Sequence, residues 1–190
     1  MSTEIISARE VTKRFGGLTA VNSVSVEVKE GQIFSIIGPN GAGKTTFFNC
    51  ISGFYTPEHG DVLLDGRSMC GKGTDAISAA GIARTYQNIR LFSSLTALEN
   101  VMVGYHHRSN EGWVDAVLRT PRHKREEHAA LDEALKWLGF VGLADAANAL
   151  SISLPYGAQR RLEIARALAS HQRLLLLDAP TAGMTPHETL

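Results

Sequence analysis

Residues 38–46 read Gly38-Pro39-Asn40-Gly41-Ala42-Gly43-Lys44-Thr45-Thr46 and fit the G-x-x-x-x-G-K-[ST] pattern of a phosphate-binding loop. Glycines in such a loop let backbone N–H groups point inward, along a path that side chains would obstruct. The apolar run 33–37 predicts a short strand before the loop, and residues 47–52 predict a helix after it. A helix that opens in this way turns unpaired N–H groups and the positive end of its dipole toward an anion. The sequence therefore predicts nucleotide binding, with Lys44 supplying positive charge and Thr45 a hydroxyl for Mg²⁺.

The composition is that of a folded globular domain. The 190 residues are 44% hydrophobic, and the 19 basic and 19 acidic side chains leave a formal net charge of zero. This balance favours neither nucleic acid nor a membrane surface as a partner, and we expect no nucleic acid. Because no apolar run is long enough to cross a bilayer and no signal peptide begins the chain, we expect a cytoplasmic protein. Cys50 and Cys70 lack metal or redox spacing, and we expect Cys50 to be a buried thiol.

The segment before the loop is predicted to be rich in β-strand over residues 4–37. From residue 24 to 29 valine alternates with polar residues, which is the period of a half-buried strand. Residues 61–66 predict another short strand that ends in a turn. Phe15 lies in a polar segment flanked by glycine, where an aromatic ring either stacks on a nucleotide base or fills the core. The local sequence does not separate these two interpretations.

Two polar side chains follow predicted strands, at the end where α/β sheets bind their ligands. Residues 81–86 predict a strand that Gln87 follows. Residues 173–178 predict a fully buried strand that ends in the carboxylate of Asp178. The glutamine contacts metal or water in one interpretation and is a plain surface residue in the other. Downstream of a phosphate loop, Asp178 is the expected Mg²⁺ ligand.

From residue 95 the spacing of apolar residues changes from that of strands to that of helices. Thr96 and Glu99 form a capping box, which predicts a helix through about Tyr105. Residues 124–140 predict a second helix. Its predicted apolar face consists of Leu131, Leu135 and Leu138.

A third helix is predicted over residues 160–170, and the segment 154–159 leads into it. The pair Tyr156-Gly157 leaves backbone N–H groups accessible before the helix, which suits a second contact to an anion.

Together these residues resemble an ABC-type nucleotide-binding domain, from about Glu4 to the last residue. The resembling elements, in the family's order, are Phe15 in the adenine-stacking loop, the Walker A loop 38–46, Gln87 of the Q-loop, the signature segment 154–159 and the Walker B strand ending at Asp178. The segments most similar to ATP-binding subunits of branched-chain amino acid importers are 49–55, 84–92 and 156–166, and 120–149 resembles that group's helical subdomain. The resemblance implies an α/β P-loop NTPase fold with an antiparallel β lobe and a helical subdomain, C-terminally incomplete.

The resemblance also implies how the chain is divided and what it binds. A single domain spans 1–190, with the β lobe and P-loop core at about 1–90 and 151–190 and the helical subdomain at about 91–150. ATP and Mg²⁺ are the implied cofactors. The implied ATP-binding residues are Phe15, Gly38, Asn40, Gly41, Ala42, Gly43, Lys44, Thr45 and Thr46, with Tyr156 and Gly157 acting on the nucleotide of a second subunit. The implied catalytic residues are Lys44 and Gln87, and the implied metal ligands are Thr45, Gln87 and Asp178.

The partners implied by the resemblance are a second ABC ATP-binding subunit, identical or different, and integral membrane permease subunits. Head-to-tail closure of the subunits over ATP would drive amino-acid import, with this chain peripheral on the inner face of the plasma membrane. An alternative is an ATP-binding clamp or switch module without turnover, or an incomplete copy of a transport subunit. Co-purification with membrane subunits separates these hypotheses.

The chain departs from the family's pattern in ways that bear on turnover. Ala179 stands where the family has the glutamate that polarises the attacking water, and loss of a general base costs about 10²- to 10⁴-fold in rate. Pro155 replaces the signature serine and removes a hydroxyl that would contact the γ-phosphate. Leu190 precedes the strand and switch histidine with which the family continues, so we expect unpaired backbone at the sheet centre. We therefore expect this chain to bind ATP better than it hydrolyses it.

Overall fold

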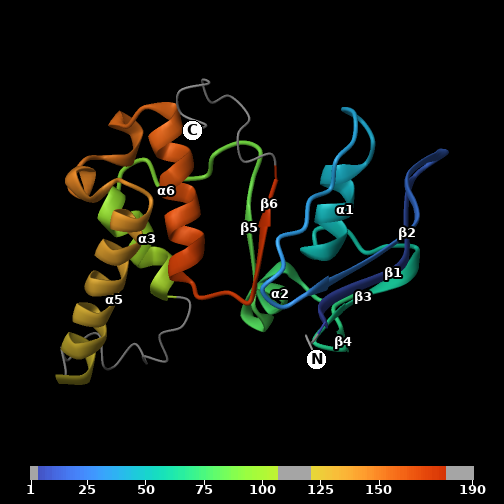
Figure 1. Cartoon of the computed structure of the whole chain (residues 1–190), viewed down its shortest axis with the longest axis horizontal. Helices are drawn as coiled ribbons and strands as arrows, with labels where there is room; N and C mark the ends of the chain where they lie inside the picture. Colours follow the sequence, from blue (N-terminus) through green and yellow to red (C-terminus); the bar gives the residue numbers. More distant parts are fainter. Residues whose placement is uncertain (1–3, 107–120, 179–190) are drawn as a thin grey trace. The chain divides into compact units, whose positions relative to one another are not determined.

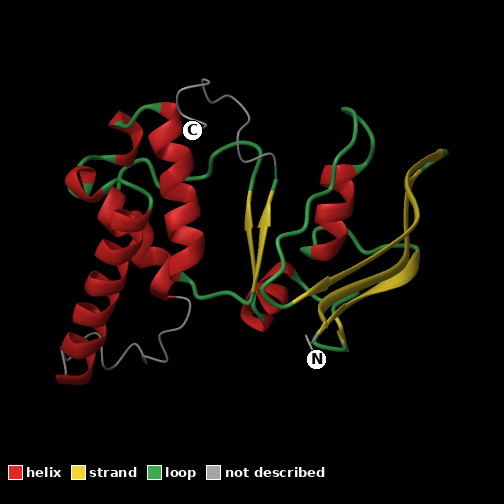
Figure 2. Ribbon diagram, viewed as in Figure 1, coloured by secondary structure: helices red, strands yellow, loops and turns green. Residues whose placement is uncertain are grey.

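The computed structural model describes residues 4–106 and 121–178. The chain divides into two compact units, which cover residues 1–82 and 83–190 (Figure 1). Strands dominate the described part of the first unit and helices that of the second (Figure 2), which confirms the mixed α/β class. Among the helices of the described ranges, none is long and apolar enough to span a bilayer. The helical-subdomain boundaries at about 91–150 stay a prediction.

An antiparallel sheet forms most of the first unit. Its strands, in spatial order, are β2 (Leu18–Lys29), β1 (Glu4–Phe15), β3 (His59–Leu64) and β4 (Arg67–Ser68). The register places Ser7 opposite Glu27 on one side and opposite Leu63 on the other. Val28 is buried while Ser25 and Glu27 are exposed, so the alternation predicted for this strand is confirmed. The sheet is the antiparallel β lobe that the resemblance implied.

Helix α1 (Lys44–Ile51) packs against β1 and β2, and α2 (Thr74–Ala80) follows later in the same unit. The side of α1 that carries Phe47, Cys50 and Ile51 is buried. Cys50 is 4% exposed, which confirms the predicted buried thiol. Burial raises the pKa of this thiol to about 11, although the positive charge of Lys13 acts in the opposite direction.

The strand predicted over residues 33–37 is wrong. The structure describes this segment as irregular, and Ile33 and Ile37 are 96% and 93% exposed. A strand is stabilised by hydrogen bonds to a neighbouring strand, and none of the described strands pairs with this segment. The apolar run indicated a preference for burial, but it carried no information about the pairing partner.

Strand β5 (Ile82–Thr85), which lies in the second unit except for its first residue, pairs with β6 (Leu174–Leu177), and both arrows run in the same direction (Figure 2). Both strands lie where the sequence predicted them. The prediction of a fully buried final strand is wrong, because Leu177 is 37% exposed whereas Leu176 is 7% exposed. Within the described residues β6 has one neighbouring strand, so part of its surface stays accessible.

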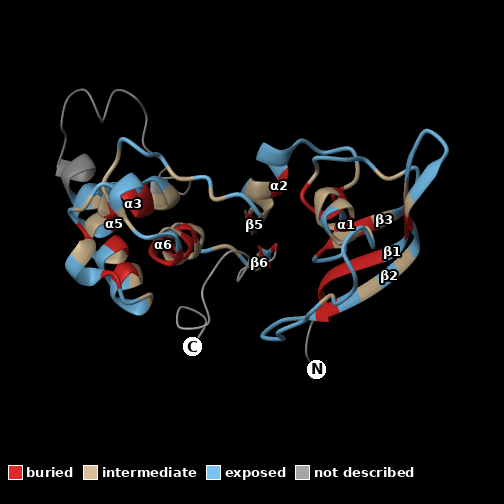
Figure 3. Cartoon of the chain, turned by 90° about the horizontal axis from the view of Figure 1, so that it is seen from above, coloured by how far each residue is buried: buried red, intermediate tan, exposed pale blue. Residues whose placement is uncertain are grey.

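Three helices of the described chain form the core of the second unit: α3 (Ala97–His106), α5 (Pro121–Phe140) and α6 (Tyr156–Ala169). Short 3-10 turns, η1 (Ala144–Ala146) and η2 (Ser151–Ser153), connect α5 to α6. Figure 3 shows the buried side of α6 among the other helices. Gly104 permits a close approach, because a Cβ there would overlap the carbonyl oxygen of Arg166 on α6.

The capping box at the start of α3 is confirmed. The Thr96 N–H donates to Glu99 Oε2 at 2.8 Å, and the Glu99 N–H donates to Thr96 Oγ1 at 3.2 Å. These bonds satisfy N–H groups that helix formation leaves without intrahelical partners. The bonds that the Thr96 N–H and hydroxyl donate to the Glu99 carboxylate hold the pKa of Glu99 below its usual value.

The predicted apolar face of α5 needs one correction, because Leu135 is 42% exposed. The buried residues in the described part of this helix are Ala130, Ala134 and Leu138, and the last two belong to the core shared with α3 and α6. Small alanines let the neighbouring helices approach closely, and the leucine one position on from Ala134 is rotated out of that contact. α6 also begins earlier than predicted, at Tyr156 instead of residue 160.

Candidate functional site

The loop before α1 has the backbone geometry of an anion cradle. Gly41 and Gly43 have φ of 82° and 85°, in the left-handed region that glycine adopts at little cost. Gly43 is the N-cap of α1, and no side chain accepts a hydrogen bond from the first turn of this helix. Those N–H groups and the positive helix end are therefore available to a phosphate, so the loop fits the predicted ligand.

The Lys44 ammonium lies over this loop. Its Nζ donates to the carbonyl oxygens of Gly38 at 2.6 Å and Pro39 at 2.7 Å. A flexible cation held by weak neutral acceptors can exchange them for an anionic phosphate oxygen, which forms stronger charge-assisted hydrogen bonds. Thr45 is exposed, so its hydroxyl is accessible as an oxygen ligand.

We expect Gly43→Ala to destabilise the chain more than Gly41→Ala. Both backbones have positive φ, and a Cβ in that conformation costs roughly 1–2 kcal/mol. At Gly43 the Cβ would also overlap the carbonyl oxygen of Ala20, an overpacking that adds roughly 1–3 kcal/mol, whereas Gly41 faces open space. Urea unfolding of both variants measures the difference. Equal losses of unfolding free energy would contradict the close contact at Gly43.

Phe15 lies on the surface of the first unit. Its ring is 42% exposed and packs edge-on against Tyr55, with ring centroids 5.2 Å apart. The Lys13 ammonium lies 5.5 Å from the Phe15 ring centroid and pairs with Glu58 at 2.6 Å. An exposed ring does not fill the core, so the base-stacking interpretation is the one that remains, as a prediction.

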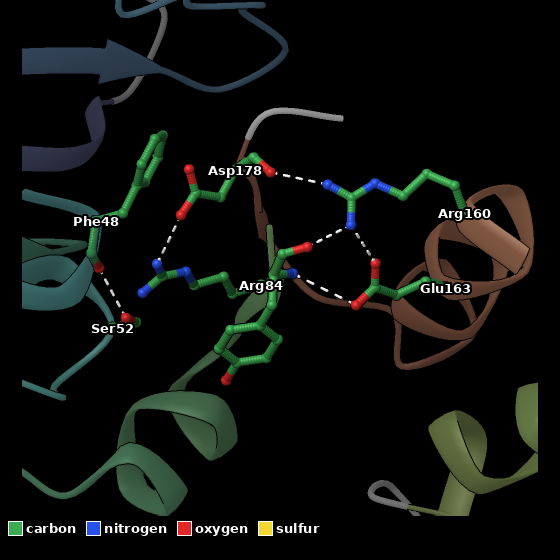
Figure 4. A network of polar contacts seen from close by, with 7 residues as sticks. Phe48, Ser52, Arg84, Arg160, Glu163 and Asp178 are labelled. Atoms are coloured by element: carbon green, nitrogen blue, oxygen red, sulfur yellow. Dashed lines mark hydrogen bonds and ion pairs between the residues drawn. The ribbon is translucent and has the colours of Figure 1, made fainter. Parts of the chain in front are cut away.

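The carboxylate of Asp178 lies in a buried ion pair. Asp178 directly follows β6, and its Oδ2 lies 2.9 Å from Nη2 of Arg84 on β5 (Figure 4). The two side chains are 7% and 5% exposed. The hard carboxylate oxygen is the type of ligand that Mg²⁺ prefers, so the donor chemistry at this position fits the cation.

A second buried ion pair joins α6 to the ends of both strands. Arg160 Nη1 lies 2.7 Å from Glu163 Oε2 and also donates to the carbonyl oxygen of Tyr86. Arg160 Nη2 donates to the Asp178 carbonyl oxygen at 2.8 Å. Glu163 Oε1 accepts from the N–H groups of Tyr86 and Arg90, both at 3.4 Å. One ion pair thus holds the segment around Gln87 and the backbone of Asp178 (Figure 4).

The start of α6 fits the predicted second contact to an anion. Pro155 is its N-cap, and no side chain caps the first turn. Tyr156 is 43% exposed, whereas Gly157 is buried. Open N–H groups at the positive end of a helix suit an anion, and the tyrosine is accessible to a second molecule.

The sequence-predicted site residues are distributed over both units. The first unit carries Phe15 and the loop residues 38–46; the second carries Gln87, Tyr156, Gly157 and Asp178. Gln87 is exposed just after β5. Within residues 4–106 and 121–178, no three His, Cys, Asp or Glu side chains cluster as a metal site. The Ala179 position lies outside the described residues.

Sequence reasoning missed Arg84, Arg160 and Glu163. The opposite charges of Arg160 and Glu163, three positions apart, were the available signal, but such pairs are usually exposed on helix surfaces. Their full burial accompanies contacts with Tyr86 and Asp178, which follow β5 and β6 and lie far from α6 along the chain, so a local pattern does not reveal it.

Comparison with known proteins decides the family. The model of the ABC transporter family matches residues 21–182. The chain belongs to the ABC transporter family. Matched curated ABC transporter proteins include the high-affinity branched-chain amino acid transport ATP-binding proteins BraF of Pseudomonas aeruginosa and LivG of Escherichia coli K12. The chain is 47% identical to BraF and 44% to LivG over 189 residues, which cover 100% of this chain and 74% of each relative.

Solved ABC transporter cassettes have the same fold. A nucleotide-free ATP-binding cassette matches 98% of this chain and 73% of its own, with a TM-score of 0.79 and 30% identity. The dimeric structure of the bacterial cassette MJ0796 matches 97% of this chain and 78% of its own, with a TM-score of 0.80 and 29% identity. The P-loop fold inferred from the sequence is therefore confirmed.

Proposed function

We propose that this chain is the ATP-binding subunit of an ABC importer for branched-chain amino acids. The observation that carries this proposal is the match of the whole chain to BraF and LivG, together with the glycine-lined loop that opens α1. Its partners would be membrane permease subunits and a second ATP-binding subunit, with the chain on the inner face of the plasma membrane. A dimeric cassette of the same fold supports the second subunit.

In this proposal Phe15 stacks on the adenine, and the backbone N–H groups of residues 38–46 hold the phosphate chain. Lys44 moves from its own loop carbonyls to the phosphates. Mg²⁺, when bound, would neutralise phosphate charge, and the side chains of Thr45, Gln87 and Asp178 would hold it. Tyr156 and Gly157 would contact the nucleotide of the second subunit.

Hydrolysis by this chain is proposed to be weak. The residue after Asp178 is Ala179, and a methyl group neither accepts a proton nor orients water. Pro155 has no hydroxyl, so the hydrogen bond that the signature serine would form with the charged γ-phosphate is absent. Such a bond is worth about 1.5–3 kcal/mol. These substitutions favour, as a second candidate function, an ATP-binding switch that closes without turnover.

The nucleotide-binding role predicts a large effect at Lys44. Loss of its charge-assisted hydrogen bonds should weaken binding of a fluorescent ATP analogue by about 10- to 100-fold in Lys44→Ala. Fluorescence titration of the purified chain in EDTA measures this affinity without the metal. Lys72→Ala removes an exposed lysine of the same unit outside the loop and should leave the affinity unchanged. Equal affinities in all three proteins would contradict the assigned loop.

The transport role is tested by co-purification. A tagged chain expressed in a bacterium with intact importers should carry integral membrane permease subunits after detergent extraction. Recovery of soluble partners alone would overturn the importer assignment and favour the switch module. The nucleotide titration then decides whether the loop itself functions.

A further inference from the structure

The carboxylate proposed to hold the cation already has a cationic partner. Arg84 Nη2 and Asp178 Oδ2 are 2.9 Å apart, and both side chains are almost completely buried. Water screens such a pair poorly, so the attraction between the two groups is stronger than at the surface. A divalent cation approaching Asp178 therefore meets a neutral pair with a guanidinium beside it, not a free anion.

The surrounding contacts allow the side chain of Asp178 to exchange partners while its backbone stays in place. Its carbonyl oxygen accepts a hydrogen bond of 2.8 Å from Arg160, and this contact does not involve the carboxylate. The Arg84 guanidinium has a second favourable neighbour, because its Cζ lies 5.3 Å from the centroid of the Tyr86 ring. An aromatic face stabilises a cation that loses part of its interaction with a carboxylate.

We propose that Arg84 is a built-in competitor of the divalent cation for Asp178. In the metal-free protein Arg84 on β5 neutralises the buried carboxylate of Asp178, just after the end of β6. When the cation is bound, Asp178 turns its carboxylate from Arg84 to the metal, and Arg84 keeps its contact with the ring of Tyr86. Arg84 is thus a positioning residue that sets metal affinity, and the inference rests on the proposed role of Asp178 as a metal ligand.

The structure offers a matched control for the charge of Arg84. Arg90 also places its guanidinium over the Tyr86 ring, with Cζ 4.8 Å from the ring centroid. Among the described residues, Asp178 forms an ion pair with Arg84 and none with Arg90. Arg90→Gln therefore removes a neighbouring positive charge without removing the contact to the carboxylate.

The test measures Mn²⁺ binding to the full chain in the presence of saturating ADP, by electron paramagnetic resonance of free Mn²⁺. Arg84→Gln removes the competing charge and should raise Mn²⁺ affinity about tenfold. The Arg84 guanidinium lies 2.9 Å from the Asp178 carboxylate, and the attraction between unit charges so close together corresponds to at least a tenfold change in affinity. Arg84→Lys keeps a charge but loses the planar fork, and should give a smaller rise. Arg90→Gln should change the affinity less than about twofold, since exposed charges are screened.

Thermal unfolding without metal gives an independent measurement. Arg84→Gln leaves the buried carboxylate without its cationic partner, so its metal-free midpoint should fall below that of the parent chain. Saturating Mn²⁺ and ADP should then raise the midpoint by more than in the parent. If Arg84→Gln does not fold without metal, the smaller affinity gain of Arg84→Lys decides the inference.

The outcomes separate this inference from the proposed function. Asp178→Asn should weaken Mn²⁺ binding and leave ADP binding in EDTA unchanged. If Asp178→Asn weakens Mn²⁺ binding but both Arg84 variants bind Mn²⁺ no better than the parent, the competition is wrong and the metal role stands. Unchanged Mn²⁺ binding in Asp178→Asn would overturn both the metal role and the competition. A parent chain that binds no ADP would overturn the proposed function itself.

Discussion

Ala179→Glu is expected to hydrolyse ATP about 10²- to 10⁴-fold faster than the parent chain, because it supplies the general base that a methyl group cannot replace. Steady-state phosphate release at saturating Mg-ATP measures the rate. The affinity for a fluorescent ATP analogue should stay the same, since the substitution adds a group that acts on water and not on the nucleotide.

Ala179→Gln is the matched control for this prediction. Its side chain has nearly the size of glutamate but accepts no proton, so its rate should stay close to that of the parent. Equal acceleration by both variants would mean that polarity or size matters at this position and not basicity. If tight ATP binding persists and neither variant accelerates hydrolysis, Ala179 is not what limits turnover, and the switch-module alternative is favoured.

The second large effect is expected at Arg160. Arg160→Ala leaves Glu163 as a buried charge without its partner, and breaking a buried pair in this way costs about 3–5 kcal/mol of unfolding free energy. The side chains of the pair are 0% and 1% exposed, so solvent screens the interaction little. Urea unfolding followed by circular dichroism measures the loss.

An exposed ion pair with the same spacing provides the comparison. Lys136 and Glu133 on α5 also lie three positions apart at 3.1 Å, but the lysine side chain is 62% exposed. Lys136→Ala should cost less than about 1 kcal/mol, because solvent screens surface pairs. Similar losses in Arg160→Ala and Lys136→Ala would show that burial does not strengthen the Arg160 pair.

Local patterns were most reliable where a residue acts through its own backbone or its near neighbours. Gly41 and Gly43 adopt the left-handed conformations that the loop pattern requires, and Thr96 and Glu99 form the predicted capping box. Each of these depends on hydrogen bonds or dihedral angles within a few residues, which the order of amino acids largely determines.

Patterns were less reliable where the outcome depended on a distant segment. The apolar run 33–37 does not form a strand in the described residues, because pairing needs a neighbour that hydrophobicity does not specify. Leu135 was predicted on the buried face of α5, but it is exposed, and the preceding residue, Ala134, is buried in the helix contact instead. In both places the apolar residues were identified correctly, and their environment was not.

The sequence by itself determined the phosphate loop and the family to which the chain belongs, because these depend on residue types at short spacings, and the resemblance to that family implied the antiparallel lobe. Only the tertiary structure decided that Arg84 neutralises Asp178 and that Arg160 joins α6 to both strand ends. These residues lie between 18 and 94 positions apart along the chain. Packing brings their charges together in an interior that water does not screen, and no local pattern encodes that proximity.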